Sequence, residues 1–256
     1  MPQENNRIFA RISHATLCEG TETPVGHGNN RPVRCVIKME DGSIQAAVLK
    51  RLSQPSLSIE IFCSLVLRNW GLHVPQPILV RDKTGTLAFA SADNGFPDFK
   101  QNLGFDDELP PDVRHELRVR AGELISGFSQ TPLAIAADEA IKNRDRHLEN
   151  ILWDGTEVAW IDHEGALGNS VEPDQNRLVR LVCLQGGYES VRDKAMKAAA
   201  LIATAPPASF PEGLPPAGSN GIEFATTLAE GLELLSQKVL HRFPQPEDLL
   251  SPPPTR

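Results

Sequence analysis

Residues 138–164, DEAIKNRDRHLENILWDGTEVAWIDHE, carry the strongest structural signal in the chain. Within this run Asp145 and Asn150 are five positions apart, and Asp162 directly follows an apolar stretch. Phosphoryl transfer needs a carboxylate beside the attacking hydroxyl, together with an amide and a second carboxylate that hold Mg²⁺ against the phosphates. Asp145, Asn150 and Asp162 have the side chains for these three tasks.

The same run predicts a β-hairpin after Asn150. Two apolar stretches, residues 151–153 (ILW) and 158–161 (VAWI), flank the turn sequence Asp-Gly-Thr at 154–156. An Asp-Gly turn between apolar stretches is a strong hairpin signal. We expect closure of this hairpin to bring Asn150 close to Asp162, so that both side chains can bind the same metal ion.

Composition sets the outer limits of the interpretation. The chain has 256 residues, of which 40% are hydrophobic and 23% are charged, as in a globular protein with one domain or two lobes. Its formal net charge of −8 argues against direct binding of nucleic acid. The four cysteines form no C-x-x-C pair, so neither a zinc site nor a disulfide framework is indicated.

Targeting signals are also absent from the sequence. The first residues contain no apolar core of a signal peptide, and no apolar run approaches the length of a membrane span. We therefore expect a cytoplasmic protein that does not enter a membrane.

The N-terminal third has the pattern of a small antiparallel sheet with one helix. The predicted strands cover residues 8–17, 33–38, 44–50, 78–80 and 86–90, and the predicted helix covers residues 58–72. Gly20, Gly26 and Gly28 lie between the first two strands, but their spacing does not match G-x-G-x-x-G. A phosphate-covering loop and an ordinary surface loop both remain open there.

Lys50 and Glu60 are candidates for a paired lysine and glutamate in this third. Lys50 ends the predicted strand 44–50, and Glu60 is the only acidic residue of the predicted helix, one turn from its start. A strand-end lysine is often a solvated edge residue, and a first-turn glutamate can simply complement the helix dipole. We favour a pair in which Glu60 orients Lys50.

The rest of the chain is predicted to be mainly helical. Residues 93–111 have the composition of a connecting loop. The predicted helices cover residues 112–128, 133–141, 176–185, 191–204 and 223–240. Residues 251–256, which read SPPPTR, predict a disordered tail.

These residues together resemble a known family. The pattern Asn143-x-Asp145-Arg146-His147-x-x-Asn150, followed by Ile-Asp-His-Glu-Gly at 161–165, resembles the HipA-like branch of the protein-kinase-like superfamily. It is also similar to the phosphatidylinositol 3/4-kinases, which share an Asp-Arg-His-x-x-Asn loop. The motif covers about residues 138–167, and the Lys50 and Glu60 assignments extend the resemblance loosely toward the N-terminus.

The resemblance implies an α+β, bilobal protein-kinase-like fold with a small antiparallel β-rich N-lobe and a mainly helical C-lobe. Residues 1–92 would form the ATP-binding lobe and residues 93–250 the helical lobe. The catalytic loop would be residues 143–150 and the metal-binding segment residues 161–165, with the tail beyond residue 250.

Residue roles follow from the same resemblance. Asp145 would take or orient the proton of the acceptor hydroxyl, while Asn150 and Asp162 would bind Mg²⁺. Lys50, held by Glu60, would bind the phosphates of ATP.

The remaining polar residues of the loop have two interpretations each. His147 is grouped with Asp145 as a catalytic candidate, although packing within the loop also explains it. Lys142, Arg144 and Arg146 flank Asp145 and would either neutralise a phosphate or an acidic substrate, or form a solvated basic edge.

The acceptor is not fixed by the resemblance. HipA-like relatives phosphorylate Ser or Thr of proteins, and some act in toxin–antitoxin pairs, which implies a protein substrate and an antitoxin-like partner. The sequence Asp162-His163-Glu164 departs from Asp-Phe-Gly and is reminiscent of small-molecule phosphotransferases that act on aminoglycosides or choline. A small-molecule or phosphoinositide-type kinase and a non-catalytic nucleotide-binding module therefore stay open.

Overall fold

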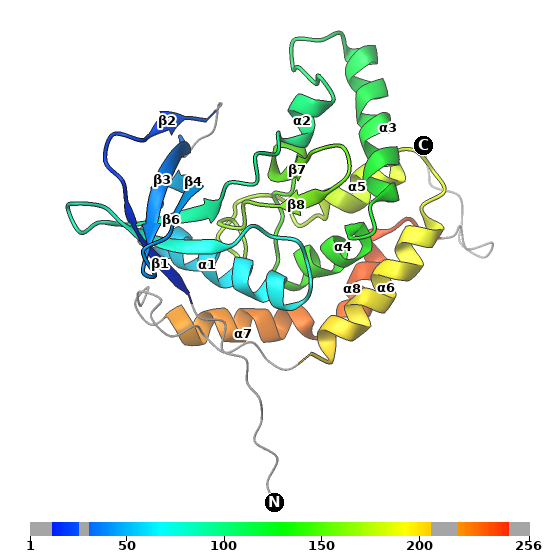
Figure 1. Ribbon diagram of the computed structural model, residues 1–256. Helices are drawn as coiled ribbons and strands as arrows, with labels where there is room; N and C mark the ends of the chain where they lie inside the picture. The colour runs from blue at the N-terminus through cyan, green and yellow to red at the C-terminus, as the bar shows by residue number, and fades with distance from the viewer. Residues whose placement is uncertain (1–11, 26–30, 206–219, 246–256) are drawn as a thin grey trace, which may run out of the picture.

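The computed structural model describes residues 12–25, 31–205 and 220–245 and places a β-sheet beside a group of helices (Figure 1). The strands are β1 (Ser13–Leu17), β2 (Thr23–Pro24), β3 (Val33–Met39), β4 (Ile44–Lys50), β5 (Pro77–Arg81), β6 (Leu87–Ala92), β7 (Ile151–Trp153) and β8 (Val158–Trp160). The helices are α1 (Gln54–Asn69), α2 (Phe99–Asn102), α3 (Pro111–Gly127), α4 (Thr131–Ala140), the 3₁₀ turn η1 (Leu148–Asn150), α5 (Arg177–Cys183), α6 (Glu189–Ala203), α7 (Asn220–Leu232) and α8 (Leu235–Arg242). The chain is therefore of the mixed α+β class.

Some of the sequence predictions fall outside the described residues. They concern residues 8–11 of the first predicted strand, Gly26, Gly28 and the tail 251–256. Among the helices that the structure describes, none has the length and apolar character needed to cross a membrane.

The large sheet is mixed, which corrects the expected antiparallel lobe. Its strand order is β1-β5-β6-β4-β3-β2, and β1 also pairs with β3, so the sheet closes on itself. The β1–β5 pair is parallel, with Ser13 opposite Ile78, whereas the other pairs are antiparallel. A parallel pair needs a long crossover, and here β3, β4 and α1 lie between β1 and β5 in the chain.

Small and aliphatic side chains fill the interior of the closed sheet. Alternate residues of a strand point to one face, so every second position faces this interior. Strands β5 and β6 also have buried residues on their other face, where α1 packs. The interior set is Ala15, Cys35, Ile37, Ala47, Leu49, Ile78, Val80, Ala88 and Ala90. This packing fixes the register of β4, whose last residue is Lys50.

Helix α1 begins earlier than the sequence predicts. Ser53 is its N-cap residue and Pro55 lies in its first turn, where a missing N–H costs nothing. Glu60 therefore lies beyond the first turn and is buried, rather than complementing the start of the helix. The helix lies against β5 and β6 on the outer face of the sheet.

Helix α4 is the centre of the helical part. It contacts α6, α8 and α7, and its alanine-rich surface is fully buried. The backbone of α7 approaches it closely, because a Cβ atom added to Gly231 would lie only 1.8 Å from the carbonyl oxygen of Ala140. Glycine at 231 thus allows α7 to cross the end of α4, just before the loop that contains Asp145.

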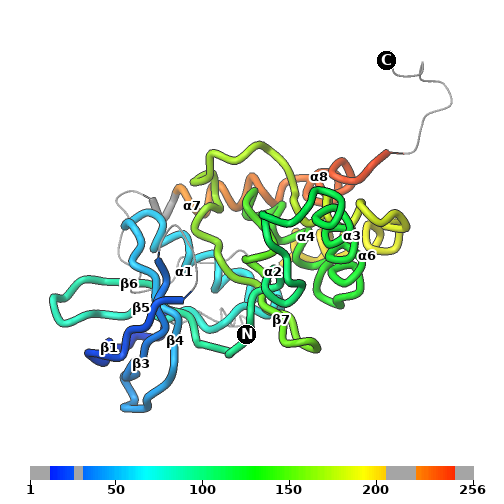
Figure 2. The backbone as a smooth tube through the Cα atoms, turned by 90° about the horizontal axis from the view of Figure 1, so that it is seen from above, coloured from blue at the N-terminus to red at the C-terminus, as the bar shows by residue number. Residues whose placement is uncertain are grey.

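The single helix predicted for residues 223–240 is two helices. Leu234 has a φ of +51°, in the left-handed region, and separates α7 from α8. The break lets α8 contact α4 and α6 while α7 reaches α1, where the rings of Phe62 and Phe224 are 5.9 Å apart. Both views show α7 and α8 on this course (Figures 1 and 2).

Candidate active site

The predicted hairpin forms and joins the two halves of the motif. Strands β7 and β8 pair with Ile151 opposite Trp160, and the Asp154 carboxylate accepts hydrogen bonds from two turn N–H groups at 2.8 and 2.7 Å. Beyond the strands, the N–H of Ile161 donates to the carbonyl oxygen of Asn150 at 3.1 Å. The residue before Asp162 is thereby bonded directly to Asn150, as the sequence predicts.

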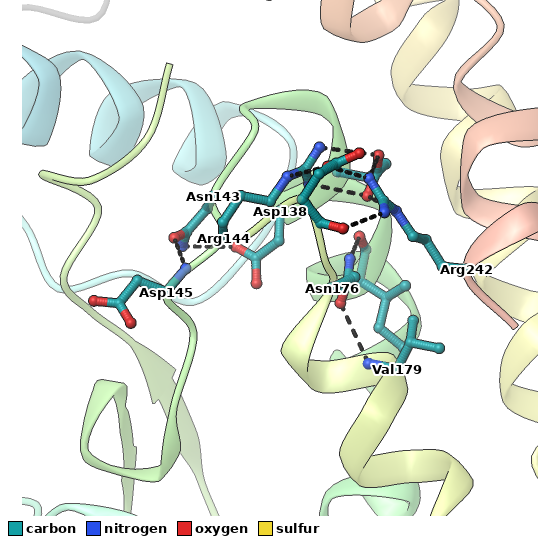
Figure 3. A network of polar contacts seen from close by, with 10 residues as sticks. Asp138, Asn143, Arg144, Asp145, Asn176, Val179 and Arg242 are labelled. Atoms are coloured by element: carbon teal, nitrogen blue, oxygen red, sulfur yellow. Dashed lines mark hydrogen bonds and ion pairs between the residues drawn. The ribbon is translucent and has the colours of Figure 1, made fainter. Parts of the chain in front are cut away.

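Two buried amides hold the loop around Asp145. The Nδ2 of Asn150 donates to the carbonyl oxygen of Asp145 at 2.9 Å, and the Oδ1 of Asn143 accepts from the Asp145 N–H at 3.2 Å. The Asp145 side chain itself is 42% exposed, and Figure 3 shows its carboxylate turned away from the surrounding network. The loop backbone is fixed, and the carboxylate faces solvent.

The buried position of Arg146 contradicts its interpretation as a phosphate contact or as part of a solvated basic edge. Its side chain is 1% exposed and makes a two-point ion pair with Asp138, at 2.8 and 3.0 Å. Its Nη1 donates to the carbonyl oxygens of Asn150 and Ile161, and the guanidinium lies over the Trp160 ring. Arg146 therefore ties the Asp145 loop to the strand that leads into Asp162.

Lys142 and Arg144 also form ion pairs with carboxylates. Lys142 Nζ lies 3.0 Å from Glu230 of α7, and Arg144 makes a two-point contact with Glu139 of α4. The basic residues beside Asp145 in sequence thus bind acidic residues of the helical part.

Lys50 lies at the point where the sheet meets the helical part. Its Nζ is 2.9 Å from Oδ1 of Asp162, and the two side chains are 12% and 30% exposed. Asp162 has a φ of +66°, in the left-handed region, a conformation that costs energy for a residue other than glycine. The strained backbone turns the Asp162 carboxylate toward the amine of Lys50.

The charge state of Lys50 follows from its surroundings. Burial alone would lower the pKa of Lys50, but the carboxylates of Asp162, Glu60 and Glu164 outweigh burial, and the pKa lies above its usual value. The lysine is therefore a cation at neutral pH, surrounded by negative charge.

Glu60 makes a different contact from the one expected. Among the described residues, no ion pair within 4.0 Å joins Glu60 to Lys50; its Oε2 accepts a hydrogen bond from the N–H of His163, and its Oε1 lies 3.5 Å from His163 Nδ1. His163 is completely buried, with Ser64 Oγ 3.5 Å from its Nδ1. The negative charge of Glu60 thus stabilises the Lys50 cation without direct contact. Its carboxylate binds the backbone N–H of His163, the residue after Asp162.

Three carboxylates at this point have the arrangement of a cation site. Oxygens of Glu60, Asp162 and Glu164 lie within 4.8 Å of one another. Carboxylate oxygens are the ligands that Mg²⁺ prefers, so the side chains present fit this ion. Glu164 is absent from the sequence candidates, although its position two residues after Asp162 could have suggested it.

Arg177 is a second residue that the sequence candidates omit. Its Nη1 lies 3.1 Å from Oδ1 of Asp145, and its Nη2 pairs with Glu172. His147 Nε2 is 4.0 Å from the same Asp145 oxygen, and the His147 side chain is 36% exposed rather than packed in the loop. Arg177 is far from Asp145 in sequence, at the start of α5, so no local pattern indicates the contact.

The structure thus gathers the candidates into two neighbouring groups. Lys50, Glu60 and Asp162 meet with Glu164, while Asp145, His147 and Asn150 share the loop with Arg177 beside it. Arg146 and the hydrogen bond between Ile161 and Asn150 connect the two groups.

Comparison with solved structures identifies the fold. The crystal structure of the Helicobacter pylori proinflammatory kinase CtkA is similar, with a TM-score of 0.55 and 14% sequence identity over 89% of this chain and 94% of that chain. This likeness establishes a kinase-like fold. No family model matches the chain, and no curated protein matches it significantly by sequence.

Proposed function

We propose that the protein is a HipA-like kinase that uses ATP and Mg²⁺ to phosphorylate a hydroxyl group, with Ser or Thr of a protein as the acceptor. The observation that carries this proposal is the 2.9 Å contact between Lys50 Nζ and Asp162 Oδ1. In protein kinases a strand lysine binds the phosphates of ATP, and an aspartate after the catalytic loop binds the metal. The kinase-like fold of the chain supports the proposal.

On the nucleotide side, Lys50 would bind phosphate oxygens, for which its cationic state is suited. Asp162, Asn150 and Glu164 would hold Mg²⁺, which when bound offsets negative charge on the phosphates. Glu60 would position this group, because it binds the backbone of His163 next to Asp162.

On the acceptor side, Asp145 would orient the hydroxyl and receive its proton. The acceptor oxygen forms a bond to the γ-phosphorus, the bond from that phosphorus to the oxygen bridging the β- and γ-phosphates breaks, and ADP leaves. Arg177 contacts one oxygen of the Asp145 carboxylate at 3.1 Å, which keeps the carboxylate oriented. His147 lies 4.0 Å from the same oxygen and would be a second polar neighbour of the Asp145 carboxylate.

In this proposal residues 1–92 are the ATP-binding lobe, and residues 93–250 are the lobe that receives the acceptor. The Lys50 contact with Asp162 joins the two, since β4 belongs to the first and the segment after β8 to the second.

A small-molecule acceptor is the second candidate, and one observation favours it. Glu164 shares the carboxylate cluster with Asp162, and an Asp-x-Glu sequence at this place resembles small-molecule phosphotransferases more than protein kinases. The nucleotide chemistry would be the same, and the acceptor would differ.

Transfer from γ-labelled ATP tests the proposal and separates the two acceptors. The purified protein is incubated with labelled ATP, Mg²⁺ and a cell lysate, and labelled proteins are then separated from labelled metabolites. We expect label in protein bands well above the background that an Asp145→Asn variant gives with the same lysate. Label only in metabolites would support the second candidate, and no transfer above the Asp145→Asn background would contradict kinase activity.

A further inference from the structure

Four charged side chains outside the Lys50 group form a closed network beside the Asp145 loop. They are Glu139 of α4, Arg144 of the loop, Asp174 and Arg242 of α8. Figure 3 shows Arg144 and Arg242 turned toward the same place, next to the loop of Asp145. The network joins three parts of the chain that are distant in sequence.

The contacts in this network are bidentate and mutually neutralising. Arg144 contacts both oxygens of Glu139 at 3.0 and 3.2 Å, and Arg242 contacts both at 3.0 Å. Oδ1 of Asp174 lies 2.8 Å from Arg144 Nε and 2.6 Å from Arg242 Nη2. Two arginines and two carboxylates cancel in charge, and two-point arginine–carboxylate pairs hold geometry well.

Burial divides the network into an inner and an outer part. The Glu139 side chain is 3% exposed, whereas that of Asp174 is 74% exposed. Glu139 therefore holds both arginines from inside, and Asp174 closes the network from the solvent side. A hydrogen bond from Arg242 lowers the pKa of Asp174, so this carboxylate is ionised at neutral pH.

The position of the network in the chain connects it with the proposed chemistry. Arg144 directly precedes Asp145, and Asp174 lies in the segment 163–176, which links Asp162 to α5. Many kinases order this segment by phosphorylating it, because the phosphate pairs with arginines. In this chain the Asp174 carboxylate already gives the segment a negative charge that pairs with two arginines, Arg144 and Arg242.

The segment 163–176 contains a single candidate for phosphorylation of a hydroxyl group. Ser170 is the only residue with a hydroxyl group between positions 163 and 176, and its Oγ accepts a hydrogen bond from the Glu172 N–H at 3.0 Å. The residues after Asp174 continue the attachment: Asn176 donates to the carbonyl oxygen of Ile135 at 3.0 Å and caps α5.

We propose that Asp174 is a positioning residue for phosphoryl transfer, which holds the Asp145 loop through Arg144 so that transfer needs no prior phosphorylation of the segment 163–176. This inference rests on the proposed kinase function. Asp174 touches neither substrate in this account; it acts through Arg144 and the adjoining Asp145 backbone.

The test compares Asp174→Asn with Asp174→Glu and with a control, Asp193→Asn. Asp193 is an exposed carboxylate on α6 that pairs with Arg192, so its change removes the same charge elsewhere. We expect Asp174→Asn to lower kcat about tenfold, since small misplacements of catalytic groups have effects of this order or larger. KM for ATP should change less than about twofold, and Asp174→Glu should recover most of the rate.

A second measurement treats the wild-type protein with a phosphatase before the assay. An unchanged transfer rate after phosphatase treatment supports the inference, and a lost rate contradicts it. In the comparison of variants, an Asp174→Asn protein as active as Asp193→Asn would also contradict it.

Hydrogen exchange tests the role of Asp174 independently of enzymatic activity. If the wild type transfers no phosphate, the proposed kinase function fails, but the exchange measurement can still be made. The role of Asp174 in holding the Asp145 loop is then judged by hydrogen exchange at the amides of residues 143–150. Exchange should be faster in Asp174→Asn, and an unchanged rate of exchange would overturn the inference.

Discussion

Lys50 Nζ lies 2.9 Å from Oδ1 of Asp162, and this contact joins the last residue of β4 to the segment that follows β8. The two residues come from different parts of the fold, the closed sheet and the helical part. Glu60 and Glu164 add negative charge around the lysine, so its ammonium group balances an acidic cluster.

Removing the Lys50 charge should weaken both nucleotide binding and the fold. Lys50→Met keeps the length of the side chain but leaves the carboxylates of Glu60 and Asp162 without their cation. We expect MgATP affinity to fall at least about tenfold and stability to fall by about 2 kcal/mol, because an uncompensated buried charge is costly. Calorimetry and urea denaturation measure the two effects. Lys38→Met, on the exposed face of β3, is the control, and an unchanged MgATP affinity in Lys50→Met would contradict the role of Lys50.

Neutralising Asp145 should affect turnover alone. Asp145→Asn should reduce kcat by about 10²- to 10⁴-fold, the usual contribution of a general base, and leave MgATP binding within about twofold. Because the Asp145 side chain is half exposed, the variant should fold normally. Single-turnover transfer and calorimetry check this pair of results. Wild-type turnover in Asp145→Asn would assign the base elsewhere.

Arg146 should be a stability residue. Arg146→Met removes the partner of Asp138, which is itself buried, and should lower the free energy of unfolding by about 3 to 5 kcal/mol. Arg120→Met, which breaks an exposed pair with Glu123 on α3, should cost less than about 1 kcal/mol. Urea denaturation of both variants gives the comparison. Equal effects would show that the buried pair does not hold the loop.

Glu60 should contribute stability that disappears in acid. Burial raises the pKa of Glu60, but the Lys50 charge and the hydrogen bonds from His163 lower it more, so the folded pKa lies below the usual value. A group with a depressed folded pKa stabilises the protein above its unfolded pKa, about 4.3, and loses this effect as pH falls through the folded pKa.

We therefore expect Glu60→Gln to be less stable than the wild type at pH 7, with the difference shrinking below about pH 4. Unfolding free energies between pH 7 and pH 2 measure it. A difference that stays constant with pH would mean that Glu60 acts by packing alone.

The local parts of this structure could be predicted from the sequence. The Asp-Gly turn specifies the hairpin β7–β8 by short-range geometry. Closing the hairpin brings the Ile161 N–H to the carbonyl oxygen of Asn150 without help from any distant residue. Helices α3, α4, α5 and α6 follow from apolar residues at helical spacing. Each of these signals lies within a short window of sequence.

The contacts that were missed depend on how segments of the chain fold onto one another, and no short sequence pattern indicates them. Arg146 appears as one of several basic residues in the sequence, and only Asp138 and the two carbonyl groups show why it is buried. Arg177 reaches Asp145 because α5 folds back to the loop. The parallel pairing of β1 with β5 likewise depends on closure of the whole sheet, which strand patterns do not encode.

The most direct test of the account is a crystal structure with a non-hydrolysable ATP analogue and Mn²⁺ in place of Mg²⁺, located by its anomalous scattering. We predict a phosphate oxygen within hydrogen-bonding distance of Lys50 Nζ, and Mn²⁺ coordinated by Asp162 on the side that faces Asn150. A nucleotide bound away from Lys50, or Mn²⁺ bound without Asp162, would contradict the central claim.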